Sequence, residues 1–210
     1  METEARRAEE ARGASVVLDA CAGALLNEPS DTVLDDMRSV VTALGLDEGS
    51  LGADKPLEWL VQRYYDRCFV AVSPLFVPCQ ESCLRGSWVD DGVRKYGATS
   101  SAQADHVVRC YGAAGFDWRA LEGSELFLKT LKPDSLAAEL AFVAYLKGCE
   151  AMADDADQAE RCAAFAGQFI REHVGTWLPL AARILAEGDE DFYASVVSLA
   201  DVTIASLRAE

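Results

Sequence analysis

The sequence predicts an all-α fold, a single-domain bundle of roughly eight to ten helices over residues 1–210. Apolar residues recur at three- and four-residue spacing, and the two-residue alternation of a half-buried strand is scarce. Proline and glycine fall where helices would begin and end. No proline-rich linker, fixed-period repeat or low-complexity run divides the chain, so we expect one domain with one core.

The helical spacing is most regular in the second half of the chain. Leu136 is followed by apolar residues at i+4, i+7 and i+10, which places them all on one face of a helix. A helix buries such a stripe against a core. Similar stripes recur in three further segments: Cys162, Phe165 and Phe169; Leu178, Ala181 and Leu185; and Phe192, Val196, Leu199 and Val202.

Prolines mark where two helices begin. Pro56 and Pro133 are expected in first turns, because a proline there sacrifices no hydrogen bond within the helix. Asp134 or Ser135 can cap the second of these helices, since either side chain can accept a hydrogen bond from a free backbone N–H group.

Glycines mark where other helices end. Gly175 followed by Thr176 indicates a helix end and a new N-cap, and Gly188 followed by Asp189 repeats the pattern before the last helix. We expect helices near residues 5–27, 31–44, 56–72, 79–86, 102–114, 134–151, 155–173, 176–187 and 189–208, with loops at 45–55 and 115–132.

The charge of the chain limits its partners. Lysine and arginine number 19 against 35 aspartate and glutamate, a formal net charge of −16. A nucleic-acid backbone or an anionic membrane would need a compensating basic surface, so both partners are disfavoured. We expect a partner that is cationic, or neutral with cationic groups.

Seven cysteines cannot all pair within one chain, and they contain no Cys-x-x-Cys motif. Cys79 and Cys83 would share one face of a helix, which leaves a redox or metal-binding pair open. The better supported interpretation is that the cysteines are small apolar residues in a reducing cytoplasm.

The N-terminus and the apolar segments favour the same compartment. No uninterrupted apolar run reaches the roughly 18 residues needed to span a bilayer. Arg6 and Arg7 are followed by Glu9 and Glu10, and Asp19 interrupts the apolar stretch beyond them, unlike an export signal. We interpret this segment as the first helix of a folded cytoplasmic domain.

Common catalytic motifs are missing from the sequence. It has no nucleophile elbow, phosphate-binding glycine loop or dinucleotide fingerprint. We assign neither of the two histidines, His106 and His173, to a spaced metal motif. We therefore expect no catalytic residues, no metal and no cofactor.

Four short motifs, in this order, resemble the TorD/DmsD family of cytoplasmic chaperones for exported molybdoenzymes. They are a Tyr-x-Arg-x-Phe segment, a Pro…Glu-Ser turn, a Pro-Asp loop opening a helix with Glu-Leu-x-Phe, and a late Phe-x-x-x-His-x-x-x-Trp-x-Pro element. The resemblance is clearest over residues 60–208. The matching residues are Tyr65, Arg67 and Phe69; Pro78, Glu81 and Ser82; Pro133, Asp134, Glu139, Leu140 and Phe142; and Phe169, His173, Trp177 and Pro179.

The resemblance implies a chaperone that binds the twin-arginine signal peptide, and the apoenzyme, of a molybdenum oxidoreductase until the cofactor is inserted. Carboxylates beside an apolar groove would suit such a guest, because arginine binds a carboxylate through two hydrogen bonds. The sequence departs from the family at Ser135, where the family has a loop histidine beside the groove implicated in peptide binding.

The candidate peptide-binding residues lie in or near these motifs. Each has a structural alternative: Asp134 can cap a helix, Tyr65 and Phe69 fit a core face, and most acidic residues are solvated surface. His173 and Trp177 are expected to pack between helices. The eight candidates are Tyr65, Phe69, Gln80, Glu81, Leu84, Asp134, Ser135 and Glu139.

Three functions stay open at this point. The leading hypothesis is a binding chaperone without catalytic turnover. The second is an assembly factor of the nitrate reductase type that grips a cytoplasmic subunit. The third is a thiol enzyme that uses Cys79 and Cys83. We expect either a monomer or a dimer that exchanges helices, since the loop at 115–132 is long enough for exchange.

Overall fold

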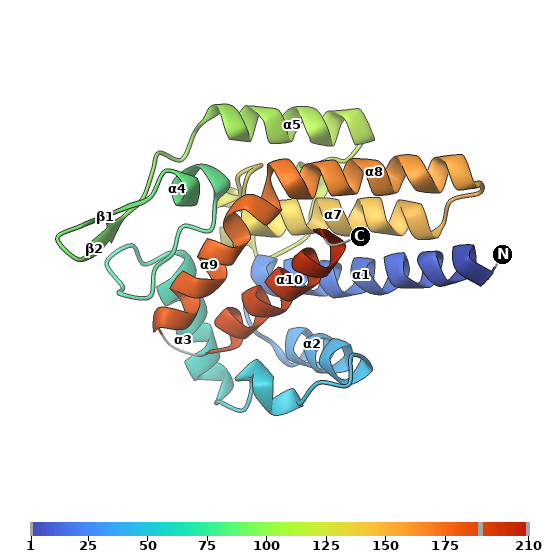
Figure 1. The fold of residues 1–210 in the computed structure, drawn as a ribbon. Helices are drawn as coiled ribbons and strands as arrows, with labels where there is room; N and C mark the ends of the chain where they lie inside the picture. The colour runs from blue at the N-terminus through green and yellow to red at the C-terminus, as the bar shows by residue number, and fades with distance from the viewer. Residues whose placement is uncertain (1, 189–190, 209–210) are drawn as a thin grey trace.

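The computed structural model describes residues 2–188 and 191–208, and within them the all-α prediction is confirmed (Figure 1). A small antiparallel hairpin, β1 (Trp88–Asp90) and β2 (Val93–Lys95), is the exception. The helices are α1 (Glu2–Leu26), α2 (Asp31–Ala43), α3 (Leu57–Cys68), α4 (Glu81–Arg85), α5 (Ala102–Ala114), α6 (Glu125–Thr130), α7 (Leu136–Ala151), α8 (Ala156–Glu172), α9 (Val174–Gly188) and α10 (Phe192–Arg208).

Helix α7 forms the centre of the core. It is buried on nearly every side, and alanines such as Ala138 and Ala141 let neighbouring helices approach closely. Helices α1 and α8 lie along it on either side, and α5 lies beyond α8 (Figure 1). Helices α9, α10 and α3 cross the end of this layer, so the predicted apolar stripe of α7 has partners on several faces.

The break between α8 and α9 differs from the prediction. We expected a stop at Gly175 and a cap at Thr176, but the chain bends at His173 and α9 includes Gly175. A Cβ on Gly175 would lie 2.6 Å from the carbonyl oxygen of Ile170, so the glycine is needed for close packing rather than to end a helix. Pro179 cannot donate to the Gly175 carbonyl, and Arg208 Nη1 donates to it instead at 2.8 Å.

Capping residues are only partly as expected. Ser135 caps α7, accepting from the backbone N–H of Ala138. Asp134, the alternative, points to a different partner described below. Asp189 lies outside the described residues, and the observed cap of α10 is Asp191, whose Oδ1 accepts from two backbone N–H groups at 3.1 Å. Pro56 precedes the first turn of α3 rather than lying in it, and Pro133 likewise lies before α7, which begins at Leu136.

Several predicted helices are longer than the helices in the structure. Helix α3 ends at Cys68 rather than at residue 72, because Phe69 and Val70 both donate to the Tyr65 carbonyl and turn the chain away. Helix α4 is shorter than the expected 79–86. The predicted loops contain short helical turns, η1 (Glu48–Leu51), η2 (Trp118–Ala120) and α6. The unpredicted hairpin turns at Asp91–Gly92, both with positive φ as a tight hairpin requires.

Across the described ranges, none of the helices combines the length and apolar character that crossing a membrane would require.

Candidate functional site

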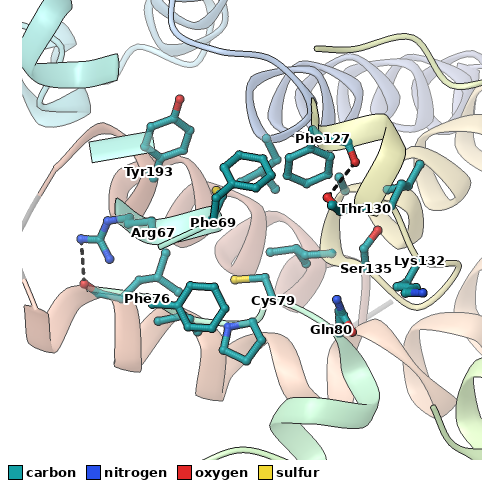
Figure 2. A pocket seen from close by; sticks show the side chains of 18 residues that line it. Arg67, Phe69, Phe76, Cys79, Gln80, Phe127, Thr130, Lys132, Ser135 and Tyr193 are labelled. Atoms are coloured by element: carbon teal, nitrogen blue, oxygen red, sulfur yellow. Dashed lines mark hydrogen bonds between the residues drawn. The ribbon is translucent and has the colours of Figure 1, made fainter. Parts of the chain in front are cut away.

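An apolar pocket of about 250 Å³ opens where the end of α3 and the segment that follows it face α6 and the start of α7 (Figure 2). It is lined by Leu25, Arg67, Cys68, Phe69, Phe76, Val77, Pro78, Cys79, Gln80, Phe127, Thr130, Leu131, Lys132, Ser135, Leu136, Ala137, Leu185 and Tyr193.

Aromatic rings form much of the wall. The rings of Phe69 and Phe127 meet edge to face with centroids 6.0 Å apart, and Tyr64 packs behind both. Phe76 lies across the pocket from Phe69, near Cys79 (Figure 2). Such half-buried aromatic and aliphatic groups can cover an apolar guest segment without leaving polar atoms unpaired.

The charged groups of this pocket are cationic. Arg67 is 2% exposed, and its Nε donates to Asp191 Oδ2 at 2.7 Å. Its Nη2 donates to the Leu185 carbonyl at 3.3 Å, at the opposite end of the pocket from exposed Lys132 (Figure 2). No carboxylate is among the described residues that line the pocket, so the expected acid-rimmed groove is not what lies here.

Two distant segments are fastened together at the pocket edge. Gln80 and Ser135 form an isolated antiparallel bridge, in which Leu136 donates to the Cys79 carbonyl at 2.9 Å. On the same edge, the Glu81 backbone N–H donates to the Asp134 carbonyl at 2.8 Å. This bridge holds the loop before α7 against the entry to α4.

Asp134 strengthens this junction with its side chain. Its Oδ2 accepts from the Ser82 backbone N–H at 3.0 Å and from the Ser82 hydroxyl. The side chain therefore caps the first turn of α4, not α7, and it is fully buried.

Two further carboxylates lie buried beside the junction. Glu81 accepts from Arg85 Nη1 at 2.7 Å and pairs with His173 Nδ1 at 2.8 Å. Glu139 Oε2 accepts from the indole N–H of Trp177 at 3.0 Å. Burial, together with the nearby carboxylates of Glu81 and Asp134, raises the pKa of Glu139 well above its ordinary value.

The motif residues thus come together, but mostly inside the protein. Glu81, Leu84, Asp134 and Glu139 are 0 to 1% exposed, so in this structure their side chains are closed to a guest. The four candidates that remain divide as follows: Phe69, Gln80 and Ser135 line the pocket, whereas half-buried Tyr65 does not and donates its hydroxyl to Glu28.

Three other aromatic residues line the pocket without a sequence signal that predicts it. Phe76 and Phe127 lie outside the expected helices and Tyr193 is not in the predicted apolar stripe of the last helix, so no periodic pattern marks the three as one wall. Contrary to our expectation for the histidines, His106 and Cys110 stand at i and i+4, a spacing that can hold a metal.

The cysteine pair gives little support to thiol chemistry. Burial raises the pKa of Cys79 to about 12, so the group stays a thiol at neutral pH and is a weak nucleophile. Cys83 is buried and donates to the Gln80 side-chain oxygen at 3.6 Å. The two therefore do not resemble an activated redox pair.

Comparison with known proteins gives one family and one similar fold. Residues 24–183 match the family described as nitrate reductase delta subunit. A crystal structure of a candidate redox enzyme maturation protein from Archaeoglobus fulgidus superposes with a TM-score of 0.50. It is 16% identical, with 91% of each chain covered. No curated protein matches the sequence significantly.

Proposed function

This chain belongs to the nitrate reductase delta subunit family, the TorD-type redox enzyme maturation chaperones, and we propose that its pocket holds an apolar segment of the client enzyme. The observation that carries this proposal is the aromatic-walled pocket itself, which leaves an apolar surface exposed beside a rigid junction. The role is one of binding without turnover.

The energetics favour an apolar guest. Burying one leucine- or phenylalanine-sized side chain contributes about 1.5–3 kcal/mol, whereas an exposed ion pair contributes about 0–1 kcal/mol. Two or three such side chains in the pocket would therefore dominate the affinity. The overall charge of −16 would act at longer range: it would orient a cationic guest and increase the rate at which the guest associates with the protein.

The finer proposal is that the guest is the twin-arginine signal peptide of a molybdenum oxidoreductase. Its apolar stretch would occupy the pocket while the two arginines lie beyond the mouth, because exposed Lys132 disfavours further cations nearby and no described lining residue offers them a carboxylate. Binding before export requires the cytoplasm, which is the location we propose. Because the signal peptide is part of the apoenzyme precursor, binding of the peptide would also hold the apoenzyme.

A second candidate function is that of an assembly factor of the nitrate reductase type, which binds a cytoplasmic subunit of its client enzyme. Two observations favour it: the description of the matched family, and the exposed cation of Lys132 on the pocket lining. An apolar segment without arginines, or with an acidic flank, would fit Lys132 better than a twin-arginine leader does.

Calorimetry tests both candidates with one set of peptides. A peptide with a Ser-Arg-Arg-x-Phe-Leu leader should bind at micromolar concentration or below, and replacing both arginines by glutamine should weaken binding if the leader is the guest. Equal binding of the two peptides would favour the second candidate. If neither of these peptides nor an N-terminal peptide of a cytoplasmic subunit gives heat of binding, the pocket is refuted as a client site.

A pair of variants on α6 locates the binding. Thr130 and Leu126 are both exposed on this helix, but Thr130 lines the pocket and Leu126 does not. Thr130→Trp should weaken binding at least tenfold by filling the mouth, while Leu126→Trp should leave it unchanged. Equal binding by both variants would place the guest elsewhere.

A further inference from the structure

A second cluster of reactive side chains lies away from the pocket, between α5 and the break that joins α8 to α9. His106 and Cys110 share one face of α5, since they are four residues apart in a helix. His173 stands opposite them at the α8–α9 break. Helix α5 lies along α8 on the outside of the bundle, which brings the three together (Figure 1).

The three donor atoms are close enough to share one ion. One ligand atom from each residue lies within 4.8 Å of the other two. The Nδ1 atom of His106 and the Nε2 atom of His173 are 2.7 Å apart, with the ring planes tilted by 30°. His106 and Cys110 are half-buried, so the cluster is within reach of solvent.

His173 is already oriented as a metal ligand would be. Its Nδ1 faces the fully buried Glu81 carboxylate at 2.8 Å, so with a neutral ring it donates there. The lone pair of Nε2 is then directed at His106. A carboxylate behind a histidine in this way fixes the ring tautomer and increases the basicity of the liganding nitrogen.

We propose that His106, Cys110 and His173 form a binding site for one zinc-type divalent cation. Imidazole nitrogen and thiolate sulfur are ligands that Zn²⁺ prefers, and three protein ligands leave the fourth tetrahedral position to water. This inference does not depend on the proposed function, because no residue of the cluster lines the pocket.

The fit requires a small movement. With Zn–N distances of about 2.0–2.1 Å, tetrahedral geometry places two nitrogens about 3.3 Å apart. The present 2.7 Å contact must therefore open by several tenths of an ångström. Half-buried His106, on an outer helix, can make that shift while buried His173 stays held by Glu81.

The charges and protons balance. Binding displaces the thiol proton of Cys110 into solvent, and the Nδ1 proton of His106 moves to its Nε2, so one proton is released per ion. Burial, with the nearby carboxylate of Glu172, raises the pKa of the Cys110 thiol, so the ion has to displace a firmly held proton. The carboxylates of Glu172 and of Glu81, which lies behind His173, attract the divalent ion.

Binding would tether α5 to the α8–α9 break. The resulting stabilisation follows from mass action, because the folded chain assembles the three ligands and the unfolded chain does not. The melting temperature should therefore rise with added Zn²⁺.

The test is equilibrium dialysis of the untagged, reduced full chain against Zn²⁺, with Co²⁺ absorption as a second readout. We expect one equivalent bound at micromolar concentration or below, and a cobalt spectrum with thiolate charge transfer. His106→Gln and Cys110→Ser should each weaken binding at least tenfold. Cys149→Ser, another half-buried free cysteine, should bind as the unaltered chain does.

The unaltered protein provides a measurement that does not depend on how variants fold. Zn²⁺ should slow alkylation of Cys110 by iodoacetamide, followed by peptide mass spectrometry, and should leave the rate at Cys149 unchanged. Lack of stoichiometric binding, or alkylation of Cys110 at the same rate with and without Zn²⁺, would overturn the proposal.

Discussion

Replacing Glu139 by glutamine should change how stability depends on pH. Burial and the carboxylates of Glu81 and Asp134 raise the pKa of Glu139, so the folded protein holds a proton there that the unfolded chain loses. Glutamine has the shape of the protonated acid. Its carbonyl can still accept from the Trp177 indole, which lies 3.0 Å from Glu139 Oε2, and its amide can donate to Glu81.

The sign follows from proton linkage. Stability from Glu139 is fully present below the pKa of the unfolded chain, near the ordinary 4.5, and is lost as pH rises toward the raised pKa of the folded state. In that window the folded state binds up to one extra proton. The free energy of unfolding then falls by up to about 1.4 kcal/mol per pH unit. Glu139→Gln removes this contribution.

Urea unfolding followed by tryptophan fluorescence between pH 4 and 8 measures the difference. The two proteins should have similar free energies of unfolding near pH 4. As pH rises, Glu139→Gln should become more stable relative to the unaltered chain. Glu160→Gln, a change at an exposed carboxylate on α8, should track the unaltered chain. A constant difference between Glu139→Gln and the unaltered chain across this range would refute the reasoning.

Three further predictions test the junction and the pocket. Ser135→Ala removes the cap of α7 and should cost about 1 kcal/mol in urea unfolding; no loss would show that the bridge to Gln80 suffices. Arg67→Met leaves buried Asp191 without its guanidinium and should cost about 3–5 kcal/mol by the same assay, whereas a loss under 1 kcal/mol would show that the pair contributes little. Lys132→Glu should tighten binding of a twin-arginine peptide by up to about fivefold, since an exposed charge pair is worth about 0.2–1 kcal/mol. If the affinity measured by calorimetry does not change, the arginines of the peptide do not bind near Lys132 at the pocket mouth.

The spacing of apolar residues was sufficient to predict the long helices, although α7 is buried on nearly every side and Val202, in the predicted stripe of α10, is 66% exposed. Leu136, Leu140, Val143 and Leu146 are all buried, as their spacing predicts. The end of α3 was not predictable in this way, since residues 69–72 are all apolar, yet Phe69 lines a pocket and Val72 is 93% exposed. Periodicity records that a residue is buried, not whether it faces a core or a cavity.

The buried acids were harder still to predict. Composition alone favours a solvated surface for Glu81 and Glu139, and only partners far along the chain reverse that expectation. Glu81 pairs with a histidine 92 positions away, and Glu139 with a tryptophan 38 positions away. The metal-compatible spacing of His106 and Cys110 was present in the sequence, but the third ligand and its orienting carboxylate required the fold.

The location of the motif residues bears on how the protein could select its client. Glu81, Asp134 and His173 fasten the 79–82 segment to the start of α7 and to the α8–α9 break, and none of them lines the pocket. We expect this buried, hydrogen-bonded network to hold the pocket walls in place. Discrimination between clients should then depend on wall and rim groups such as Phe127 and Lys132. A change in the network should lower stability and binding together, while a change at the rim should alter binding alone.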